Sequence, residues 1–219
     1  MKDESPTGET TTVRVDRVIT SGTFSLDGGT WDVDNNVWIV GDDSECIVID
    51  PAHQPDAIAE AVGDRTVKAI LLTHGHDDHI RSAGAFRDIV RAPIHLHRDD
   101  WMLWHAVYPA TDPDADIAER GTFEVAGTRL TALHTPGHSP GSVSFHLESE
   151  GTLFSGDTLF QGGPGATGRS FSDFPTIIDS IRSRILTLPA NTLVLTGHGS
   201  PTTVGAEAPR LAEWIARGH

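Results

Sequence analysis

The feature that most constrains this chain is THGHDDH, residues 73–79, where three histidines and two aspartates occupy seven consecutive positions. Folding takes such side chains out of water, and a buried imidazole or carboxylate costs free energy unless it finds a partner. A metal ion satisfies several of these groups at once. The motif therefore predicts a fold that gathers ligands around a cation.

Within the motif, alternation along an extended backbone places His74 and His76 on one face, so both can point at one ion. Asp78 and His79 follow where the chain turns, and this suits a second metal ion beside the first. A catalytic zinc ion binds nitrogen and oxygen at about 2.0 to 2.2 Å and keeps one position open for water. One short motif cannot supply all the ligands of two metal ions.

Three later stretches supply further ligands, and each places its polar residue just beyond an apolar run with strand character. They contain His138 in HTPGHSPGS, Asp157 in FSGDTLF and His198 in LTGHGS. Glycines flank these residues and permit close backbone approach, as a crowded metal centre requires; they are Gly137, Gly156, Gly197 and Gly199. The chain thus offers seven metal donors: His74, His76, Asp78, His79, His138, Asp157 and His198.

The apolar pattern predicts two groups of strands with helices between and after them. The first group of strands covers residues 13–19, 35–41, 45–50, 67–73 and 92–97, and the second covers 122–127, 128–134, 142–147, 152–157 and 192–197. Helices are predicted within 54–63, from Ile80 to Val90, over 173–186 and over 206–217. The opening motif therefore lies in a loop that leaves a strand and enters a helix.

Length and composition favour one domain over residues 12–219, because 219 residues can bury a full core. Residues 1–11 are polar and lack the apolar segment of a secretory signal, so we expect a flexible tail. No run of about 18 apolar residues could span a bilayer. These features predict a cytoplasmic protein that does not insert into membranes.

Charge and cysteine content exclude two further classes. The formal net charge of −15 argues against a nucleic-acid partner, since phosphate binding needs a basic surface. Cys46 is the only cysteine, so an intramolecular disulfide is impossible, and its place in the apolar run ECIVID predicts core packing.

THGHDDH, HTPGHSPGS, SGDTLF and TGHG, in this order, resemble the metallo-β-lactamase superfamily, whose HxHxDH signature and later His, Asp and His build a binuclear centre. The resemblance spans nearly the whole chain and implies an α+β fold, the αββα four-layer sandwich. It implies that the first metal is bound by His74, His76 and His138, the second by Asp78, His79 and His198, and both by Asp157. Asp50 matches a family position that supports the ligands from behind, where a carboxylate would fix histidine tautomers.

The activity that this resemblance implies is metal-dependent hydrolysis. Two divalent ions, expected to be zinc with iron or manganese as alternatives, would activate a hydroxide because metal binding lowers the pKa of water from 15.7 to about 7. Asp78 and Asp157 would be the catalytic carboxylates that orient it. TPGHSPGS and SGDTLF together are most similar to the glyoxalase II-like group, which hydrolyses thioesters. We therefore expect a hydroxyacylglutathione hydrolase-like thioesterase acting on an ester of a small thiol.

Other members of the superfamily remain as alternatives. Glyoxalase II proper carries a helical domain, whereas one helix closes this chain, which favours a short, single-domain form whose thiol can differ from glutathione. Persulfide dioxygenases share HxHxDH but use a single iron, so occupancy of the Asp78, His79 and His198 site would discriminate them. Lactonases of the superfamily carry a tyrosine where this chain has Phe160, and β-lactamases with a cysteine ligand would need a cysteine near Asp157.

Several residues outside the motifs have two interpretations. Arg169, in GGPGATGRSFSDF, either contacts an anionic part of the substrate or is a solvated loop charge. Trp101, Trp104 and Tyr108 either line a substrate pocket or belong to the core. His95 and His97 copy the HxH spacing without the following Asp and His, which favours ordinary strand residues over ligands.

Overall fold

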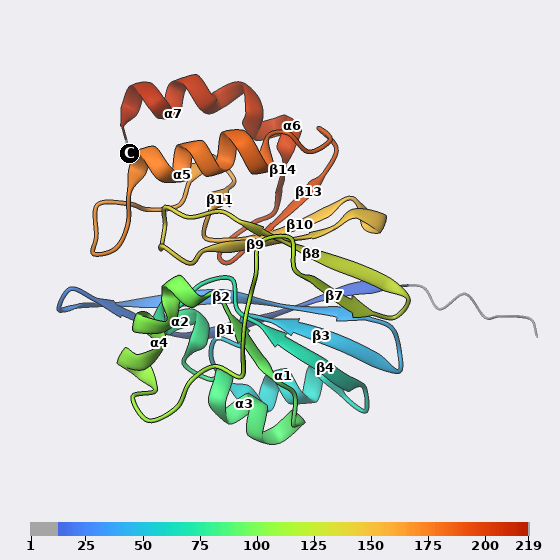
Figure 1. Ribbon diagram of the computed structural model, residues 1–219. Coiled ribbons are helices and arrows are strands. Elements are labelled where there is room, and N and C mark those ends of the chain that lie inside the picture. Colours follow the sequence, from blue (N-terminus) through green and yellow to red (C-terminus); the bar gives the residue numbers. More distant parts are fainter. Residues whose placement is uncertain (1–12, 219) are drawn as a thin grey trace, which may run out of the picture.

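The computed structural model describes residues 13–218, and the tail expected over residues 1–11 lies outside them. Two six-stranded sheets pack face to face, and helices cover the outer face of each (Figure 1). This arrangement confirms the predicted α+β fold with αββα layering.

The first sheet has the strand order β1-β2-β3-β4-β5-β6, with β1 (Arg14–Leu26), β2 (Gly29–Gly41), β3 (Glu45–Ile49), β4 (Thr66–Leu71), β5 (Ile94–Leu96) and β6 (Ala115–Asp116). The second has the order β14-β13-β10-β9-β8-β7, with β7 (Thr122–Val125), β8 (Thr128–His134), β9 (Val143–Leu147), β10 (Thr152–Gly156), β13 (Leu193–Thr196) and β14 (Thr202–Thr203). A small hairpin joins β11 (Leu159–Phe160) and β12 (Gly163–Pro164).

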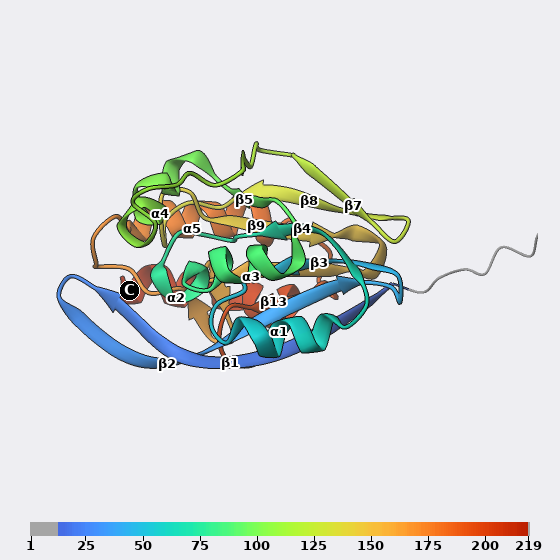
Figure 2. The same ribbon diagram turned by 90° about the horizontal axis from the view of Figure 1, so that it is seen from below.

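The outer helices follow the same division. The first sheet is covered by α1 (Pro55–Val62), α2 (Asp77–Ile80), α3 (Ala83–Val90) and α4 (Trp101–Val107), with a short 3-10 turn η1 (Arg98–Asp100) before α4 (Figures 1 and 2). The second is covered by α5 (Phe174–Ser180), its π-helical continuation η3 (Ile181–Ile185), α6 (Val204–Glu207) and α7 (Leu211–Arg217). Two further 3-10 turns are η2 (Glu148–Glu150) and η4 (Ala208–Arg210). Within residues 13–218, none of the helices is both long and apolar enough to cross a bilayer.

Three apolar layers hold the sandwich together, and strand alternation explains why. Successive side chains of a strand point to opposite faces. In β3, Cys46 and Val48 therefore pack toward the outer helices, while Ile47 and Ile49 face the second sheet. A third layer joins the second sheet to α5 and α7 around Trp214. Burial raises the pKa of the Cys46 thiol to about 11, so this cysteine is a core residue as predicted.

The first hairpin differs most from expectation. The pattern predicted short strands over 13–19 and 35–41, but β1 and β2 pair continuously from Arg14 with Gly41 to Leu26 with Gly29. Asp27 and Gly28 make the turn with φ of 51° and 78°, the left-handed pair that a two-residue hairpin needs. The Asp-Gly signal and the alternation of Phe24 and Leu26 were present in the sequence. The extension matters because it carries Phe24 and Trp31 toward the ends of the other strands.

The C-terminal helix also differs from the prediction. The helix expected over 206–217 is divided at Pro209, which cannot donate a backbone hydrogen bond.

Trp104 is 1% exposed, and Trp101 and Tyr108 pack against the same cluster. The Tyr108 hydroxyl donates to the carbonyl of Arg81 at 2.7 Å. These three aromatic residues therefore belong to the core.

Candidate metal centre

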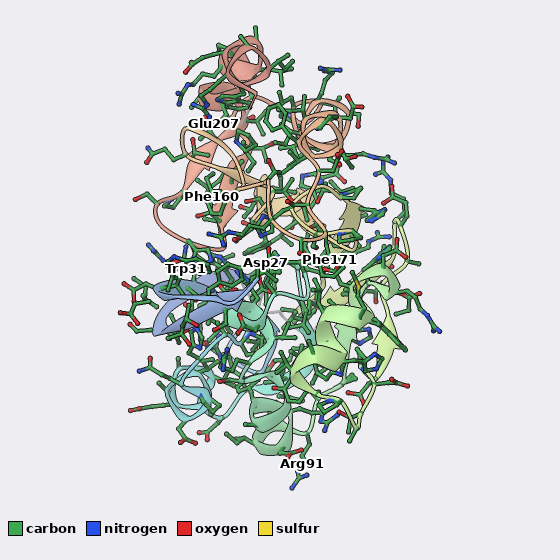
Figure 3. The ribbon with its side chains drawn as sticks, turned by 90° about the vertical axis from the view of Figure 1, so that its left-hand side faces the viewer. Asp27, Trp31, Arg91, Phe160, Phe171 and Glu207 are labelled. Atoms are coloured by element: carbon green, nitrogen blue, oxygen red, sulfur yellow. The ribbon has the colours of Figure 1, made fainter. Side chains whose placement is uncertain are left out.

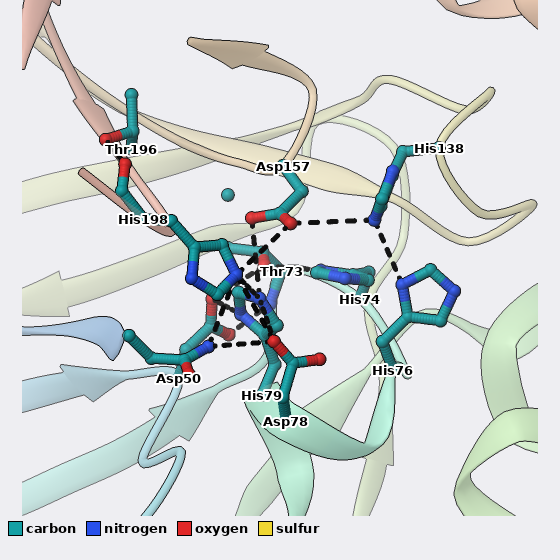
Figure 4. A network of polar contacts seen from close by, with 12 residues as sticks. Asp50, Thr73, His74, His76, Asp78, His79, His138, Asp157, Thr196 and His198 are labelled. Atoms are coloured by element: carbon teal, nitrogen blue, oxygen red, sulfur yellow. Dashed lines mark hydrogen bonds and ion pairs between the residues drawn. The ribbon is translucent and has the colours of Figure 1, made fainter. Parts of the chain in front are cut away.

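Loops from the ends of five strands meet at one edge of the sandwich (Figure 4). The opening motif follows β4, Asp50 follows β3, and His138, Asp157 and His198 follow β8, β10 and β13. All seven predicted donors lie within this region. Each of them except His198 and Asp157 is buried, and those two are only partly exposed.

Three histidines form the first set. Ligand atoms of His74, His76 and His138 lie within 4.8 Å of one another. Their rings are nearly perpendicular in pairs, at 85°, 79° and 88°, with centroids 4.6 to 4.9 Å apart. His76 Nδ1 lies 3.0 Å from His138 Nε2. Three imidazoles directed at a common point are the donor set of a tetrahedral cation with one position open.

Asp78, His79 and His198 form the second set, again with ligand atoms within 4.8 Å of one another. His198 Nε2 lies 3.2 Å from both Asp78 Oδ2 and His79 Nε2. Asp157 stands between the sets, because its Oδ1 lies 3.4 Å from His79 Nε2 and its Oδ2 lies 3.6 Å from His138 Nε2. This is the position that a bridging carboxylate requires.

Of the ring nitrogens that face away from the centre, Nε2 of His76 is buried without a hydrogen-bond partner, and those of the other four histidines have one. His138 Nδ1 donates to the Ala166 carbonyl at 2.9 Å, and His198 Nδ1 donates to the Asp34 carbonyl at 2.7 Å. His79 Nδ1 donates to Asp50 Oδ2 at 2.9 Å. Each bond keeps a proton on the outer nitrogen, so Nε2 is directed inward and can bind a metal ion once it carries no proton, as metal-binding histidines need.

A hydrogen-bond chain through Thr73 links Asp50 to His74 and fixes which ring nitrogen of His74 carries the proton. The Thr73 hydroxyl donates to Asp50 Oδ2 at 2.7 Å, so its oxygen accepts from His74 Nδ1 at 3.0 Å. His74 Nε2 is then an acceptor, yet it is buried and has no hydrogen-bond partner in the described structure. Asp157 Oδ1 is likewise buried without a hydrogen-bond donor. Buried acceptors left without donors cost free energy, and a cation between them would remove that cost.

Two glycines allow this crowding. Gly156 has a φ of 50°, and a Cβ at this position would overlap the Thr73 side chain. A Cβ on Gly197 would overlap Asp157 Oδ1 and approach His79 Cε1 to 2.7 Å. Glycine is therefore required at both positions by close approach, as the flanking glycines in the sequence suggested.

The two sets differ in charge. Burial and the neighbouring His138 lower the pKa of His76 to about 3, so this ring stays neutral and free to coordinate. Burial lowers the pKa of His198, but Asp157 and Asp78 outweigh it and raise the value to about 10. Burial opposes ionisation of Asp78, yet His79 and His198 hold its pKa at about 2. Without metal, the second set is therefore an ion-pair network.

This network predicts a pH dependence for metal-free protein. The folded pKa of His198 is raised from 6.5 to about 10, so its contribution to stability is complete below pH 6.5 and is lost as pH rises through 10. We expect the free energy of unfolding of chelator-treated protein, measured in urea, to fall across that window. His198→Ala should flatten the profile. Rising stability of the metal-free chain over the same range would contradict the ion-pair network.

Two residues near the centre were not singled out from the sequence, and one predicted residue lies at its margin. Asn35, on β2, donates from Nδ2 to Asp78 Oδ2 at 3.1 Å and has no distinctive sequence signal. Asp100, in the turn η1, accepts a hydrogen bond from the Gly75 N–H at 2.8 Å. Arg169 is exposed, and its guanidinium stacks 4.0 Å from the ring of Trp31. Its loop is tied to the first hairpin by Asp27, which accepts from the Ser170 hydroxyl at 2.6 Å.

Another group of possible ligands does not converge. His97, Asp99 and His134 have donor atoms within 4.8 Å of one another. The rings of His97 and His134 are stacked almost parallel, at 11°, and His134 Nε2 donates to the Pro140 carbonyl at 2.9 Å. In-plane lone pairs of parallel rings cannot meet at one ion. His97 is therefore a packed residue, in keeping with the interpretation favoured by its sequence context.

An αββα sandwich with His and Asp clusters at its strand ends defines a metal-dependent enzyme of the metallo-hydrolase class. The family model of the Metallo-beta-lactamase superfamily matches residues 30–198. The chain belongs to this superfamily.

Curated relatives agree with this assignment. The chain is 36% identical to the probable metallo-hydrolase YqgX of Bacillus subtilis over 186 residues, which cover 78% of this chain and 88% of the relative. It is 32% identical to the hydroxyacylglutathione hydrolase GloC of Haemophilus influenzae, over 76% of this chain and 85% of that protein.

Solved structures also share the fold. The BLEG-1 B3 metallo-beta-lactamase superposes with a TM-score of 0.74 at 32% identity, over 87% of this chain and 97% of that chain. TTHA1623, solved in a di-iron-bound form, superposes with a TM-score of 0.69 at 28% identity, over 86% of this chain and 96% of that chain.

Proposed function

We propose that this protein is a dinuclear metal-dependent hydrolase that cleaves a thioester of a small thiol. The observation that carries the proposal is the pair of complete donor sets joined by Asp157. His74, His76 and His138 would hold one divalent cation, Asp78, His79 and His198 would hold the other, and Asp157 lies between the two sets. Nitrogen and carboxylate donors suit zinc, and also iron or manganese.

The relatives support the choice of substrate class. GloC of Haemophilus influenzae is named a hydroxyacylglutathione hydrolase, and the similarity covers 76% of this chain. The name of one relative does not fix the thiol that this chain would recognise. A test of the substrate class therefore has to vary the acyl group and the thiol separately.

The chemistry needs an activated water and a polarised carbonyl. Two cations at this site would lower the pKa of water from 15.7 to about 7 and would polarise the carbonyl as Lewis acids. Burial opposes ionisation of Asp157, but His198 and His79 hold its pKa well below the usual range, so it is a carboxylate at neutral pH. Asp157 Oδ1 can then accept a hydrogen bond from the attacking water and orient it. Asn35 holds Asp78 Oδ2 in place for the same task.

The reaction balances without a further reactant. Oxygen of the water attacks the carbonyl carbon, the C–S bond breaks, and the products are a carboxylic acid and a free thiol. Thiolate is a better leaving group than alkoxide because its conjugate acid has a pKa near 8.5. The proposal therefore does not require a general acid beside the leaving group.

The test is a substrate comparison with one enzyme preparation. A 2-hydroxyacyl thioester of glutathione, the same acyl group on other small thiols, the matching oxygen ester, a lactone and a β-lactam are assayed for kcat/KM. We expect one of the thioesters to be the best substrate. A preparation containing two metals per chain that hydrolyses the lactone or the β-lactam better than every thioester would refute this substrate class.

The alternative reaction is oxidation of a persulfide at a single iron. A single iron would leave Asp78, His79 and His198 without a role, although these three converge as closely as the first set. The two-metal hydrolase accounts for both sets, so it is the function that the geometry supports best.

Arg169 is the proposed contact for an anionic part of the substrate. Its guanidinium lies over Trp31 and Phe24, and the Phe24 ring is 5.3 Å from the ring of His76. Trp31 and Asp27 of the first hairpin are labelled in Figure 3. An exposed ion pair contributes at most about 1 kcal/mol, so Arg169→Ala should raise KM by up to about fivefold with kcat unchanged.

The matched control for this prediction is Arg129→Ala, an exposed arginine on β8 at the end remote from His138. It should leave KM unchanged. If both substitutions change KM equally, or neither does, Arg169 has no specific contact with the substrate and is a solvated loop charge.

A further inference from the structure

A buried carboxylate lies behind the three-histidine set. Asp100 ends the turn η1 and directly precedes α4, and it is 0% exposed. Its side chain points toward the two loops that carry the histidines. It belongs to none of the seven proposed ligands, and the stretch RDDW around it has no motif.

Both loops donate hydrogen bonds to this one carboxylate. Asp100 Oδ2 accepts from the Gly75 N–H at 2.8 Å and from the Ser139 hydroxyl at 2.6 Å. Asp100 Oδ1 accepts from the Gly141 N–H at 2.6 Å. Gly75 separates His74 from His76, and Ser139 follows His138. The carboxylate thus joins the loop that carries two histidines to the loop that carries the third.

The backbone is shaped to bring the loops to Asp100. A Cβ on Gly75 would lie 2.9 Å from the Asp100 carbonyl oxygen, and one on Gly141 would lie 2.7 Å from Asp100 Cγ. Glycine at both positions therefore permits the short N–H contacts. Val143 N–H also donates to the Thr73 carbonyl at 2.7 Å, but this bond lies at the strand ends, beyond the histidine-bearing turns.

Burying the Asp100 carboxylate costs free energy unless hydrogen bonds compensate for the lost hydration. Burial raises the pKa of Asp100, and the hydrogen bonds from Ser139, Gly141 and Gly75 act against that rise. A buried carboxylate is tolerated when its oxygens accept strong hydrogen bonds. Here all three donors come from the two ligand loops, so the free energy that compensates for burial depends on those loops keeping their spacing.

We propose that Asp100 is a positioning residue that holds His74, His76 and His138 at the separation a single cation requires. The inference rests on the metal centre of the proposed function and adds a residue that acts through the loops. The effect is specific to the three-histidine set, because the outer nitrogens of His79 and His198 donate to Asp50 and to the Asp34 carbonyl instead. Loss of Asp100 should therefore weaken one metal site and spare the other.

Asp100→Asn is the most direct test. The amide keeps the volume but has one acceptor oxygen, so in either orientation its NH2 group faces the N–H of Gly75 or of Gly141. Substituting residues that orient metal ligands typically costs about 10- to 100-fold in metal affinity. Zinc affinity of metal-free protein is measured by competition with a chromophoric chelator, which needs no substrate.

Two backgrounds separate the sites. In His198→Ala the three-histidine set remains, and adding Asp100→Asn should weaken zinc binding by about 10-fold or more. In His76→Ala the Asp78, His79 and His198 set remains, and adding Asp100→Asn should change zinc binding less than about twofold. Equal losses in both backgrounds, or no loss in the first, would overturn the inference.

Glu207→Gln is the matched control for removing a buried carboxylate. Glu207 is 2% exposed and accepts from the Gly162 N–H at 3.1 Å and the Thr202 hydroxyl at 2.7 Å, away from the ligand loops. It should lower the midpoint of thermal unfolding without changing zinc affinity in either background. If it lowers zinc affinity as Asp100→Asn does, the effect of Asp100 is general destabilisation and the inference fails.

Ser139→Ala tests the same role of Asp100 if the Asp100→Asn variant does not fold. It removes one of the three donors, and the Ser139 N–H keeps its bond to the Ser142 hydroxyl. Zinc binding in the His198→Ala background should weaken by several-fold, and unchanged binding there would count against Asp100. A wild-type chain that binds two zinc ions but hydrolyses no thioester would refute the proposed reaction alone, whereas a chain that binds none would overturn the centre and Asp100's role together.

Discussion

Replacing His76 by alanine is expected to lower kcat/KM for the best thioester by more than about 100-fold, beyond the usual effect of residues that only orient a ligand. The imidazole lies 3.0 Å from His138 Nε2 and is 4% exposed, so no neighbouring side chain can replace it. Asp157→Ala should have an equal or larger effect, because Asp157 contacts both donor sets. Steady-state kinetics with circular dichroism on the same samples measures both.

His105→Ala is the control for this prediction. His105 lies on α4, its side chain is 42% exposed, and it pairs with Asp112 on the surface. Its removal should leave kcat/KM and the fold unchanged. Activity retained by a folded His76→Ala or Asp157→Ala variant would eliminate these residues as metal ligands.

Metal removal is expected to have the second largest effect. Chelation followed by buffer exchange should abolish hydrolysis, and it should lower the midpoint of thermal unfolding by about 10 °C. A ligand at a thousandfold excess over its Kd stabilises the folded state by about 4 kcal/mol, and each kcal/mol shifts the midpoint by roughly 2–4 °C in a chain of this size. Zinc returned at two equivalents should restore both.

The same experiment on the Asp157→Ala variant is the control. That variant should show a smaller shift on chelation, because it lacks the carboxylate between the two donor sets. If the midpoint of the native chain does not change when its metal is removed, the cluster is stable without a cation, and the buried acceptors His74 Nε2 and Asp157 Oδ1 have another explanation.

Much of the fold was predictable from the sequence because its signals are local. Strand β3 and helix α3 are each determined by a short apolar pattern, and Asp173 caps α5 by accepting from the Thr176 N–H at 2.9 Å. The positions of the seven donors beyond strand ends were also predictable, since each lies in a short motif that contains a glycine. The convergence of these loops followed from layered architecture.

Other features depend on contacts between distant segments and were missed. The length of β1 and β2 depends on pairing across thirteen residue pairs, while their apolar pattern is interrupted by polar residues at the exposed end. Asp100 accepts hydrogen bonds from residues 25 to 41 positions away. Nothing in the sequence near Asp100 distinguishes it from Asp99, which is exposed on the same turn.

The sequence signal can also be clear but ambiguous, as it is for Trp101, Trp104 and Tyr108. Aromatic residues at helical spacing fit a pocket and a core equally well, and only burial decides between them. The hydrogen bond of Trp104 Nε1 to the Thr111 carbonyl at 2.7 Å and the packing of all three into one cluster make them structural. The aromatic residues beside the proposed centre are instead Phe24 and Trp31, on the hairpin whose length the pattern did not predict.

The most direct test of the account is the metal content per chain of protein purified without added metal, measured by inductively coupled plasma mass spectrometry beside a thioester assay. The account predicts two metal ions per chain and thioester hydrolysis that scales with occupancy. One iron per chain, no thioester turnover and oxygen consumption with a persulfide would contradict it, and would leave Asp78, His79 and His198 without a function.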